Sequence, residues 1–360
     1  MERIAAGLAK QALAAMSEPS ASGETLAASW ITAQCQQLLG QPGHAWLLQG
    51  PSGLGQYRLG LELARGWLCE APGSTGSAGA CGVCNSCHAV SVRTHADLCV
   101  LMPETHALRL NWPLSEKAQA EIDDKKRKPS REIRVDAMRD TIEFAQRTSA
   151  RGRGKVVLVF PAEDMNAITA NALLKTLEEP PGDVRFILAS ESAHQLLPTI
   201  RSRCMCHTMQ WPRREVAQAW LVAQGLAGND ALRLLQASGD RPDDALLAAE
   251  NGINAAVWAA FPVAMRAGNA QPVRDWPVNV LLQSLFKLCH DAMLRSAGTP
   301  PRFFDAEAGQ GIPQLPWSAL AEWAAALKSA ARTAEHPFNL SLFQDALVEQ
   351  ARIALNSGRT

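Results

Sequence analysis

The sequence has a single tyrosine, only 6% aromatic residues and only 19% charged residues among its 360 positions. Lysine plus arginine equals aspartate plus glutamate at 35 each, so any contact with nucleic acid must come from local patches. No stretch approaches the roughly 18 uncharged apolar residues of a membrane span, and the N-terminus lacks the apolar core and cleavage site of a signal peptide. These absences predict a cytoplasmic globular protein that does not bind membranes.

What the chain does have is apolar residues and cysteine. Apolar residues make up 47% of it, enough at this length for two or three buried cores. One basic stretch, "KKRKPSR" at 125–131, is interpreted as a solvated loop. The nine cysteines would stay reduced in the cytosol, so a cluster of them indicates a metal site before a disulfide.

Four cysteines lie close together in the sequence, three of them in two successive Cys-x-x-Cys steps in "CGVCNSC" and one upstream across a Gly- and Ser-rich loop. These are Cys69, Cys81, Cys84 and Cys87. Four thiolates in one short loop suit a tetrahedral zinc ion, and His88 and His95 are alternative candidates for the fourth ligand. A closed four-cysteine site leaves no position for water, so the predicted zinc is structural rather than catalytic.

Short apolar runs alternate with helical patterns in the first 210 residues. Continuous apolar strands separated by helices predict a parallel sheet that is covered on both faces. The helical spacing of "NAITANALLKTLEEPP" at 166–181, which ends at a pair of prolines, predicts one such helix. The expected strands are 45–49, 97–101, 155–160 and 184–189.

The strand pattern disappears after about residue 210, and helical patterns continue to the end of the chain. The sequence therefore predicts an α/β domain at 24–210, which contains the cysteine segment 69–87. A small helical domain at 211–254 and an all-helical domain at 255–360 are expected to follow. Residues 1–23 are predicted to form a helical or frayed leader.

The stretch "LLQGPSGLGQYRL" at 47–59 has the outline of a phosphate-binding loop of the pattern GxxxxGK[ST]. A working loop has Lys and then Ser or Thr after the last glycine, but these two positions hold Gln56 and Tyr57. The loop therefore keeps its glycines and lacks the side chains that bind phosphate and magnesium. The glycines are Gly50, Gly53 and Gly55.

Four features occur together: the loop at 47–59, a four-cysteine insertion after the following helix, "NALLKTLEEPP" at 171–181 and "TIRSRC" at 199–204. Together they resemble the clamp-loader subunits of bacterial DNA polymerase III, which are AAA+ proteins. The resemblance covers residues 25–250 well and extends to the C-terminal region only by composition. In this family the motor subunits gamma and tau keep both nucleotide motifs, whereas delta-prime subunits often do not.

The resemblance also locates the second nucleotide motif. Counting back from "NALLKTLEEPP", the Asp-Glu pair of the motor subunits falls on Phe160 and Pro161, so both acids are absent. Glu163 and Asp164 lie three residues further on, and a shifted register that brings one of them into the site is the alternative. Phosphoryl transfer depends on Lys, metal ions and their acidic ligands, so we expect no ATP hydrolysis by this chain. Weak nucleotide binding through backbone N–H groups stays open.

The last motif is "SRC", formed by Ser202, Arg203 and Cys204. In the family, its Arg reaches into the ATP site of a neighbouring subunit as an arginine finger, and the resemblance assigns this role to Arg203. A finger supplied in trans is worth a factor of about 10³ to 10⁵ in rate in GTPase systems. The alternative is a surface arginine that pairs with a local carboxylate. Arg201, on the same turn, is a weaker candidate for the finger.

The resemblance implies a non-ATPase subunit of the polymerase holoenzyme, of the delta-prime type. Its implied partners are gamma or tau subunits, the delta subunit, the sliding clamp by weak or indirect contact, and primer-template DNA through the assembled ring. In this architecture the small helical domain is a lid and the C-terminal helices form a collar. An active ATPase subunit and a free-standing zinc-dependent nucleic-acid-binding module are the alternatives.

Overall fold

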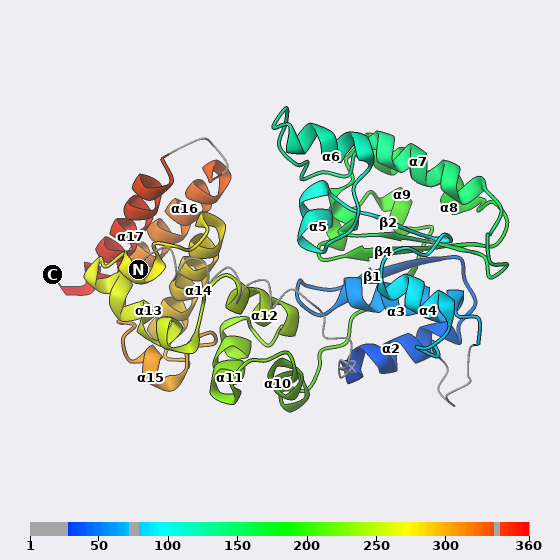
Figure 1. Ribbon diagram of the computed structural model, residues 1–360. Helices are drawn as coiled ribbons and strands as arrows, with labels where there is room; N and C mark the ends of the chain where they lie inside the picture. Colours follow the sequence, from blue (N-terminus) through cyan, green and yellow to red (C-terminus); the bar gives the residue numbers. More distant parts are fainter. Residues whose placement is uncertain (1–27, 72–78, 335–338, 360) are drawn as a thin grey trace, which may run out of the picture.

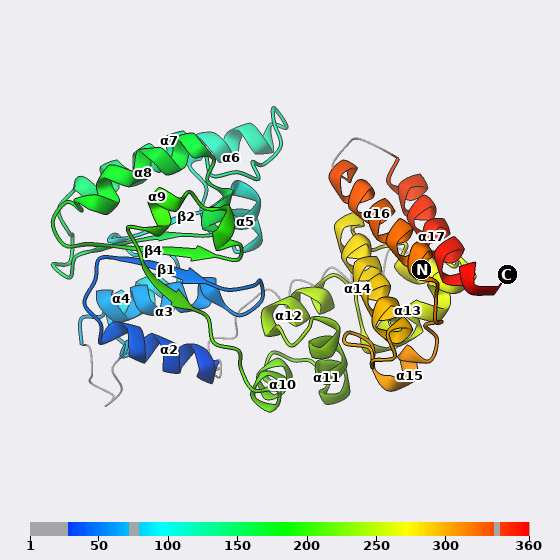
Figure 2. The same cartoon turned by 180° about the vertical axis from the view of Figure 1, so that it is seen from behind.

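The structure is a computed structural model that describes residues 28–71, 79–334 and 339–359. The expected leader at 1–23 lies outside these described residues. Figures 1 and 2 show an α/β part on one side and a helical C-terminal part on the other, with α10 Arg214–Ala223, α11 Gly228–Ala237 and α12 Pro242–Glu250 between them. The functional motifs of the sequence all lie in the α/β part.

A five-stranded sheet with the order β2-β3-β4-β1-β5 forms the centre of the α/β part, and every strand pair in it is parallel. The four strands expected from apolar runs are confirmed. The fifth, "MCHT", was missed because it is an edge strand with mostly exposed side chains and no apolar run. The strands are β1 Ala45–Gln49, β2 Leu98–Leu101, β3 Lys155–Val159, β4 Val184–Ser190 and β5 Met205–Thr208.

Alternate residues of the buried strands enter two separate cores, as the period of two in a β-strand requires. Leu48 and Leu158 face the core shared with α2 and α3, whereas Leu47 and Val157 face the core shared with α7 and α8. Helices therefore cover both faces of the sheet, which confirms the predicted α/β class (Figure 1).

The helices of the α/β part connect the parallel strands in turn. The predicted helix after "NAITAN" is confirmed as α8, which begins after the Asn166 cap and ends before the two prolines. The helices are α2 Ser29–Leu39, α3 Gln56–Leu68, α4 Asn85–Ser91, α5 Glu104–Arg109, α6 Glu116–Asp123, α7 Val135–Gln146, α8 Ala167–Glu178 and α9 Pro198–Arg201, with short 3-10 turns at η1 Ala162–Asp164 and η2 Ala193–Gln195.

From residue 209 on, the described residues form helices and loops without strands. Trp258 stacks on Phe304 with ring centroids 4.6 Å apart, and both are buried. None of the described helices is long and apolar enough to cross a bilayer. The helices are α10 Arg214–Ala223, α11 Gly228–Ala237, α12 Pro242–Glu250, α13 Ala255–Ala267, α14 Val278–Ser296, α15 Ala306–Gly309, α16 Trp317–Thr333 and α17 Leu340–Asn356, with 3-10 turns at η3 Gln271–Val273 and η4 Ser357–Arg359.

Candidate functional site

The glycine-rich loop connects the end of β1 to the start of α3, as in a phosphate-binding loop. Gly53 and Gly55 have φ angles of 77° and 92°, a left-handed conformation that glycine adopts without strain. The next residue, Gln56, is the first of α3. The backbone thus has the local course that the sequence predicted, and the side chains decide what it can bind.

Gln56 occupies the position of the expected lysine and is only 2% exposed. Its Nε2 atom donates hydrogen bonds to the carbonyl oxygens of Gly50 and Pro51, at 2.9 and 2.8 Å. The neutral amide therefore closes the loop onto itself. A lysine here would instead offer a positive charge to phosphate.

Tyr57 and Phe160 occupy the positions of the magnesium-binding hydroxyl and of the first acid of the second motif. Their rings pack against each other, with centroids 5.3 Å apart. The Tyr57 hydroxyl accepts a hydrogen bond from Nε1 of Trp112, and burial raises the pKa of the Tyr57 phenol. Two positions that would hold a magnesium ion thus form one apolar contact, which suits no divalent cation because Mg²⁺ requires oxygen ligands.

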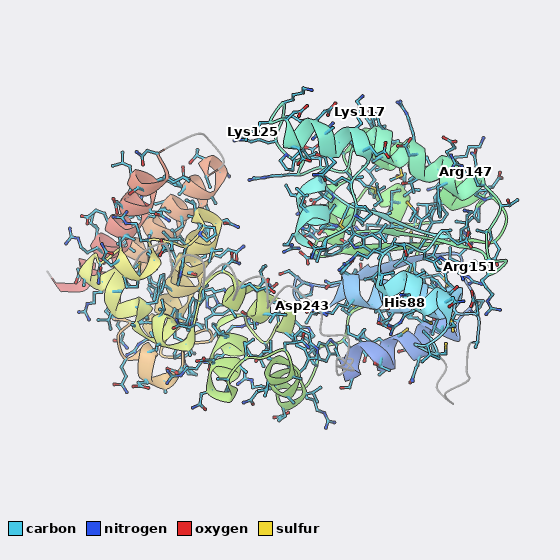
Figure 3. The ribbon with its side chains drawn as sticks, in the orientation of Figure 1. His88, Lys117, Lys125, Arg147, Arg151 and Asp243 are labelled. Atoms are coloured by element: carbon cyan, nitrogen blue, oxygen red, sulfur yellow. The ribbon has the colours of Figure 1, made fainter. Side chains whose placement is uncertain are left out.

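The first turn of α12 contacts the glycine-rich loop and the start of α3. We call this the α12 contact, in which Arg241, Asp243 and Asp244 contact Ser52, Gly53 and Arg58. Ser52 donates to Asp244 at 2.9 Å, and Arg58 pairs with Asp243 at 2.9 Å. A Cβ atom added to Gly53 would come within 2.6 Å of Asp244. Figure 3 shows Asp243 at this junction. The contact brings two carboxylates to the loop and pairs each with an arginine of this chain, so these arginines are not free to bind a phosphate.

More carboxylates lie nearby, at the ends of β3 and β4. Oε1 of Glu163 accepts a hydrogen bond from the backbone N–H of Glu191 at 2.9 Å. Burial, with the nearby carboxylates of Asp244 and Glu163, raises the pKa of Glu191 to about 7. Burial and the carboxylate of Glu163 raise the pKa of Asp164 to about 6. The surroundings therefore disfavour additional negative charge.

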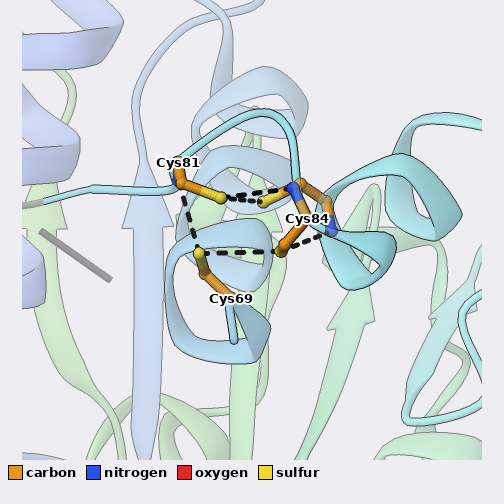
Figure 4. A group of neighbouring side chains, drawn as sticks. Cys69, Cys81 and Cys84 are labelled. Carbon is orange, nitrogen blue, oxygen red and sulfur yellow. Dashed lines mark hydrogen bonds between the residues drawn. The ribbon is translucent and has the colours of Figure 1, made fainter. Parts of the chain in front are cut away.

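The four cysteines form one cluster, although Cys69 ends α3 and Cys87 lies in α4 (Figure 4). The sulfur of Cys69 lies 3.9 Å from that of Cys84, and the sulfur of Cys81 lies 3.9 Å from that of Cys87. Zinc–sulfur bonds of about 2.3 Å in a tetrahedron require sulfur separations of about 3.8 Å. The spacing of the thiols therefore fits zinc.

Backbone N–H groups favour the thiolate form of Cys81 and Cys84, whereas burial raises the pKa of the Cys87 thiol. Cys81 donates to the sulfur of Cys69 at 3.3 Å, and Cys84 donates to the sulfur of Cys81 at 3.3 Å. Burial opposes ionisation of Cys84, but hydrogen bonds from the N–H groups of Cys87 and Glu70 outweigh it and lower the pKa of the Cys84 thiol to about 6. Thiolates are the form that binds zinc.

The two histidines considered as fourth ligands lie outside the cluster. Among the described residues, the group whose ligand atoms come together contains the four cysteines alone. Nε2 of His95 lies 3.0 Å from the Ser86 hydroxyl, and its Nδ1 accepts the backbone N–H of Asp97. His88 is exposed on α4. Four cysteines suffice for a closed zinc site, so neither histidine is required.

The SRC motif begins directly after α9. The side chain of Arg203 is 31% exposed, and its guanidinium pairs with Glu178 at the end of α8. Ser202 and Arg201 are exposed, and Cys204 is half-buried. The pairing with a local carboxylate was the alternative considered from the sequence. It is compatible with a finger, because a partly exposed ion pair is weak and exchanges partners readily.

The basic stretch at 125–131 lies in the loop between α6 and α7, with Lys125 at its exposed tip (Figure 3). Arg127 is not solvated as expected, since it donates to Glu104 at 2.8 Å and to Glu121 at 2.7 Å. It ties the loop to α5 and α6. Part of the positive charge of the stretch is therefore neutralised within the chain.

Sequence reasoning missed Glu178 and the acids of the α12 contact. Asp243 and Asp244 follow Pro242 in the first turn of a helix, where acids are common for local reasons, so nothing in the sequence connects them to the loop. Glu178 stands within the quoted "LEEPP" motif, but its partner is 25 residues away. Only the packing of α8 against α9 brings the pair together.

Comparison with known proteins places these features in a family. The family model described as "DNA polymerase III, delta subunit" matches residues 29–212, just over half of the chain. The delta' subunit of Pseudomonas aeruginosa is 40% identical over 195 residues, which cover 54% of this chain and about half, 52%, of that relative. The delta' subunit of Escherichia coli is 32% identical over 254 residues, with 69% and 67% coverage.

A motor-type subunit matches over a shorter segment. The tau subunit of Salmonella typhimurium is 33% identical over 167 residues, which cover 46% of this chain and 22% of that protein. Both delta' relatives thus match over longer segments than this tau subunit does, and the one from Pseudomonas aeruginosa also matches at higher identity. The chain belongs to the delta-prime family of DNA polymerase III subunits, within the AAA+ clamp-loader group.

Proposed function

We propose that this chain is a non-ATPase subunit of the replicative clamp loader. It supports ATP-dependent loading of the sliding clamp onto primed DNA and supplies Arg203 to the ATP site of a neighbouring motor subunit. Its partners are gamma or tau and delta subunits, with the clamp and primer-template DNA engaged through the cytoplasmic complex. Polymerase activity belongs to the holoenzyme and not to the isolated chain.

One observation carries the non-ATPase role: the chain's own side chains fill its degenerate nucleotide site. Gln56 hydrogen-bonds inside the loop, and Tyr57 packs on Phe160 where magnesium ligands would stand. Asp243 and Asp244 approach the loop from α12. Lysine and metal ions neutralise the charge in phosphoryl transfer, and this loop has neither the lysine nor the metal ligands.

The cysteine cluster supports a structural zinc ion as the cofactor. Cys69, Cys81, Cys84 and Cys87 would hold it, and the ion would join the end of α3 to α4. The set is closed, so the metal would contribute folding energy and no reaction chemistry. ATP is not expected to be a cofactor that this chain hydrolyses.

The domain division stays a proposal. Residues 211–254, with α10 to α12, form the lid domain, and residues 255–360, with α13 to α17, form the share of the collar that joins the ring. The α12 contact supports the lid assignment, because it connects this domain to the glycine-rich loop. Exposed apolar side chains such as Trp317, 58% exposed, are available for contacts between subunits.

Reconstitution tests the finger. The chain is combined with motor and delta subunits, and DNA-stimulated ATPase is compared between the intact chain and Arg203→Ala, with Arg201→Ala as the matched control. The Arg203→Ala complex should assemble, and the site next to this chain should lose a factor of about 10³ or more, so the total rate falls to that of the remaining sites. An unchanged rate in an assembled Arg203→Ala complex would refute the assignment.

The isolated chain provides the test against an active ATPase. We expect no hydrolysis of Mg-ATP by the purified chain, because the lysine and the metal ligands are replaced. Turnover that disappears with Glu163→Gln or Asp164→Asn would instead support the shifted register. DNA affinity of the isolated chain that is lost on zinc removal would support the free-standing zinc module.

A further inference from the structure

We propose that Glu178 is a positioning residue that holds Arg203 against its own subunit and releases it when phosphate arrives at the neighbouring site. This inference rests on the proposed function, since it concerns the same arginine. It assigns to the first acidic position of "TLEEPP" a role in regulating when the finger acts. Glu178 is the last residue of α8, and Arg203 follows α9.

The guanidinium of Arg203 is bound within the chain on all three nitrogens. Nε donates to Oε1 of Glu178 at 2.6 Å, and Nη2 donates to the same oxygen. Nη1 donates to the backbone carbonyl of Thr199 at 2.8 Å. The side edge of the guanidinium, formed by Nε and Nη2, is therefore occupied by a carboxylate of the same subunit.

That edge is one that arginine uses for phosphate. Arginine binds carboxylate and phosphate through the same fork of parallel N–H groups, so the two anions compete for it. Glu178 thus occupies the phosphate-binding edge of Arg203 while no nucleotide phosphate lies beside it in the neighbouring site. A nucleotide phosphate carries more charge than a carboxylate and can displace it.

Packing fixes the position of the competing carboxylate. Leu177 of α8 and Ile200 of α9 are buried in the same core under the sheet. The prolines at 180–181 end the helix directly after Glu178 and Glu179. The pair itself is partly exposed, with 31% of Arg203 and 48% of Glu178 accessible. The ion pair between Glu178 and Arg203 therefore has a fixed geometry but is weak, so that another anion can displace the carboxylate.

Glu178→Gln in the reconstituted complex is the experiment. ATPase is measured without DNA and with primed DNA. Because a neutral amide binds the guanidinium more weakly than a carboxylate does, the unstimulated rate should rise about twofold to fivefold, the population change that a partly exposed ion pair supports. The stimulated rate should change less, so the ratio of the two rates falls. Glu179→Gln removes the same charge one residue further on and should leave both rates unchanged.

Two further variants separate this inference from the proposed function. In the Arg203→Ala background, Glu178→Gln should have no effect on either rate. A merely structural role of the carboxylate would instead change the rates whether or not Arg203 is present. If Arg203→Ala lowers the stimulated rate and Glu178→Gln leaves the unstimulated rate unchanged or lowers it, the restraint is wrong and the finger stands. If Arg203→Ala has no effect in an assembled complex, both proposals fail. Gel filtration verifies assembly of every variant.

Discussion

At the scale of single residues, the side chains that replace the nucleotide-binding residues in the degenerate site make contacts within the chain. Gln56 replaces a charge by an amide that hydrogen-bonds to its own loop, and Tyr57 and Phe160 replace two metal ligands by one aromatic contact. The sequence revealed each loss separately. It did not reveal that Tyr57 and Phe160 meet, because they are far apart in the chain and only the neighbouring positions of β3 and α3 bring their rings together.

The buried ion pair of Asp97 and Lys155 is a second feature at this scale. Asp97 is fully buried at the start of β2 and accepts the backbone N–H groups of Ala150 and Arg151, at 2.7 and 2.9 Å. Nζ of Lys155 lies 3.6 Å from its carboxylate and is also buried. Burial opposes the charge of Asp97, but the two N–H groups and the Ser149 hydroxyl outweigh burial and lower the pKa of the carboxyl.

Asp97→Asn should destabilise the fold, because it leaves the buried charge of Lys155 without its partner. The expected loss is about 3–5 kcal/mol in the free energy of unfolding, measured by urea denaturation at pH 7. The exposed pair of Asp136 and Arg139 provides the control, since Asp136→Asn should cost less than about 1 kcal/mol. Equal small losses for both variants would contradict the assigned role of Asp97.

The lowered pKa of the Asp97 carboxyl predicts that the stability of the fold depends on pH. This pKa is lower in the folded chain than in the unfolded chain, so the stabilisation is fully present above about pH 4 and is lost as the pH falls below that value. The free energy of unfolding of the intact chain should therefore fall more steeply below about pH 4 than that of Asp97→Asn. Parallel curves for the two proteins would exclude a lowered pKa.

At the scale of elements, the cysteine cluster was predictable to the residue and its role in the fold was not. The Cys-x-x-Cys steps identified three of the thiols, and Cys69 was included as the cysteine upstream across the Gly- and Ser-rich loop. The structure adds that the cluster joins the end of α3 to α4 and that Cys84 caps α4, accepting the N–H of Cys87. A metal here would thus fix two helices and not a loop alone.

Zinc removal tests this role. The purified chain should contain about one zinc ion, and Cys84→Ser should lower its zinc content and its thermal stability. The expected loss is about 3 kcal/mol where free zinc exceeds the dissociation constant one hundredfold, measured by calorimetry with and without chelator. Cys206→Ser, which changes an exposed cysteine outside the cluster, is the control. Full zinc content in Cys84→Ser would point to another ligand, with His88 as the first candidate.

The sheet shows where prediction from periodicity succeeds and where it ends. Strands β1, β3 and β4 were found because both of their faces are buried, and the edge strand β2, half-buried at its centre, still has an apolar run. Strand β5, at the other edge, was missed because it exposes three of its four residues and has no such run. The hydrophobic pattern of a sequence reflects the burial of side chains and not the hydrogen bonding of the backbone. A strand that faces solvent at the edge of a sheet is therefore hard to predict from it.

At the scale of the whole molecule, the α12 contact joins the α/β part to the helices that follow. Arg241 donates to Ser52 at 2.8 Å and pairs with Asp244 at 3.1 Å, so a serine of the loop lies within a charged network from α12. Side chains of the chain itself therefore connect the two parts.

Combined Asp243→Ala and Asp244→Ala should loosen this connection. Two partly exposed ion pairs are worth up to about 2 kcal/mol together, so local opening should become about fivefold to twentyfold more frequent. Trypsin cleavage at Arg213 and Arg214, which lie between β5 and the body of α10, should accelerate by that factor. Arg352→Ala, which breaks a pair within α17, should leave cleavage at these sites unchanged.

The same double variant separates two explanations for a nucleotide-free site. If the carboxylates alone excluded phosphate, their removal would restore binding of Mg-ATP. We expect no binding in equilibrium dialysis, because Gln56 still supplies no positive charge and the contact between Tyr57 and Phe160 still offers no ligand to magnesium. Recovered binding would mean that the α12 contact, and not the replaced motif residues, keeps nucleotide out.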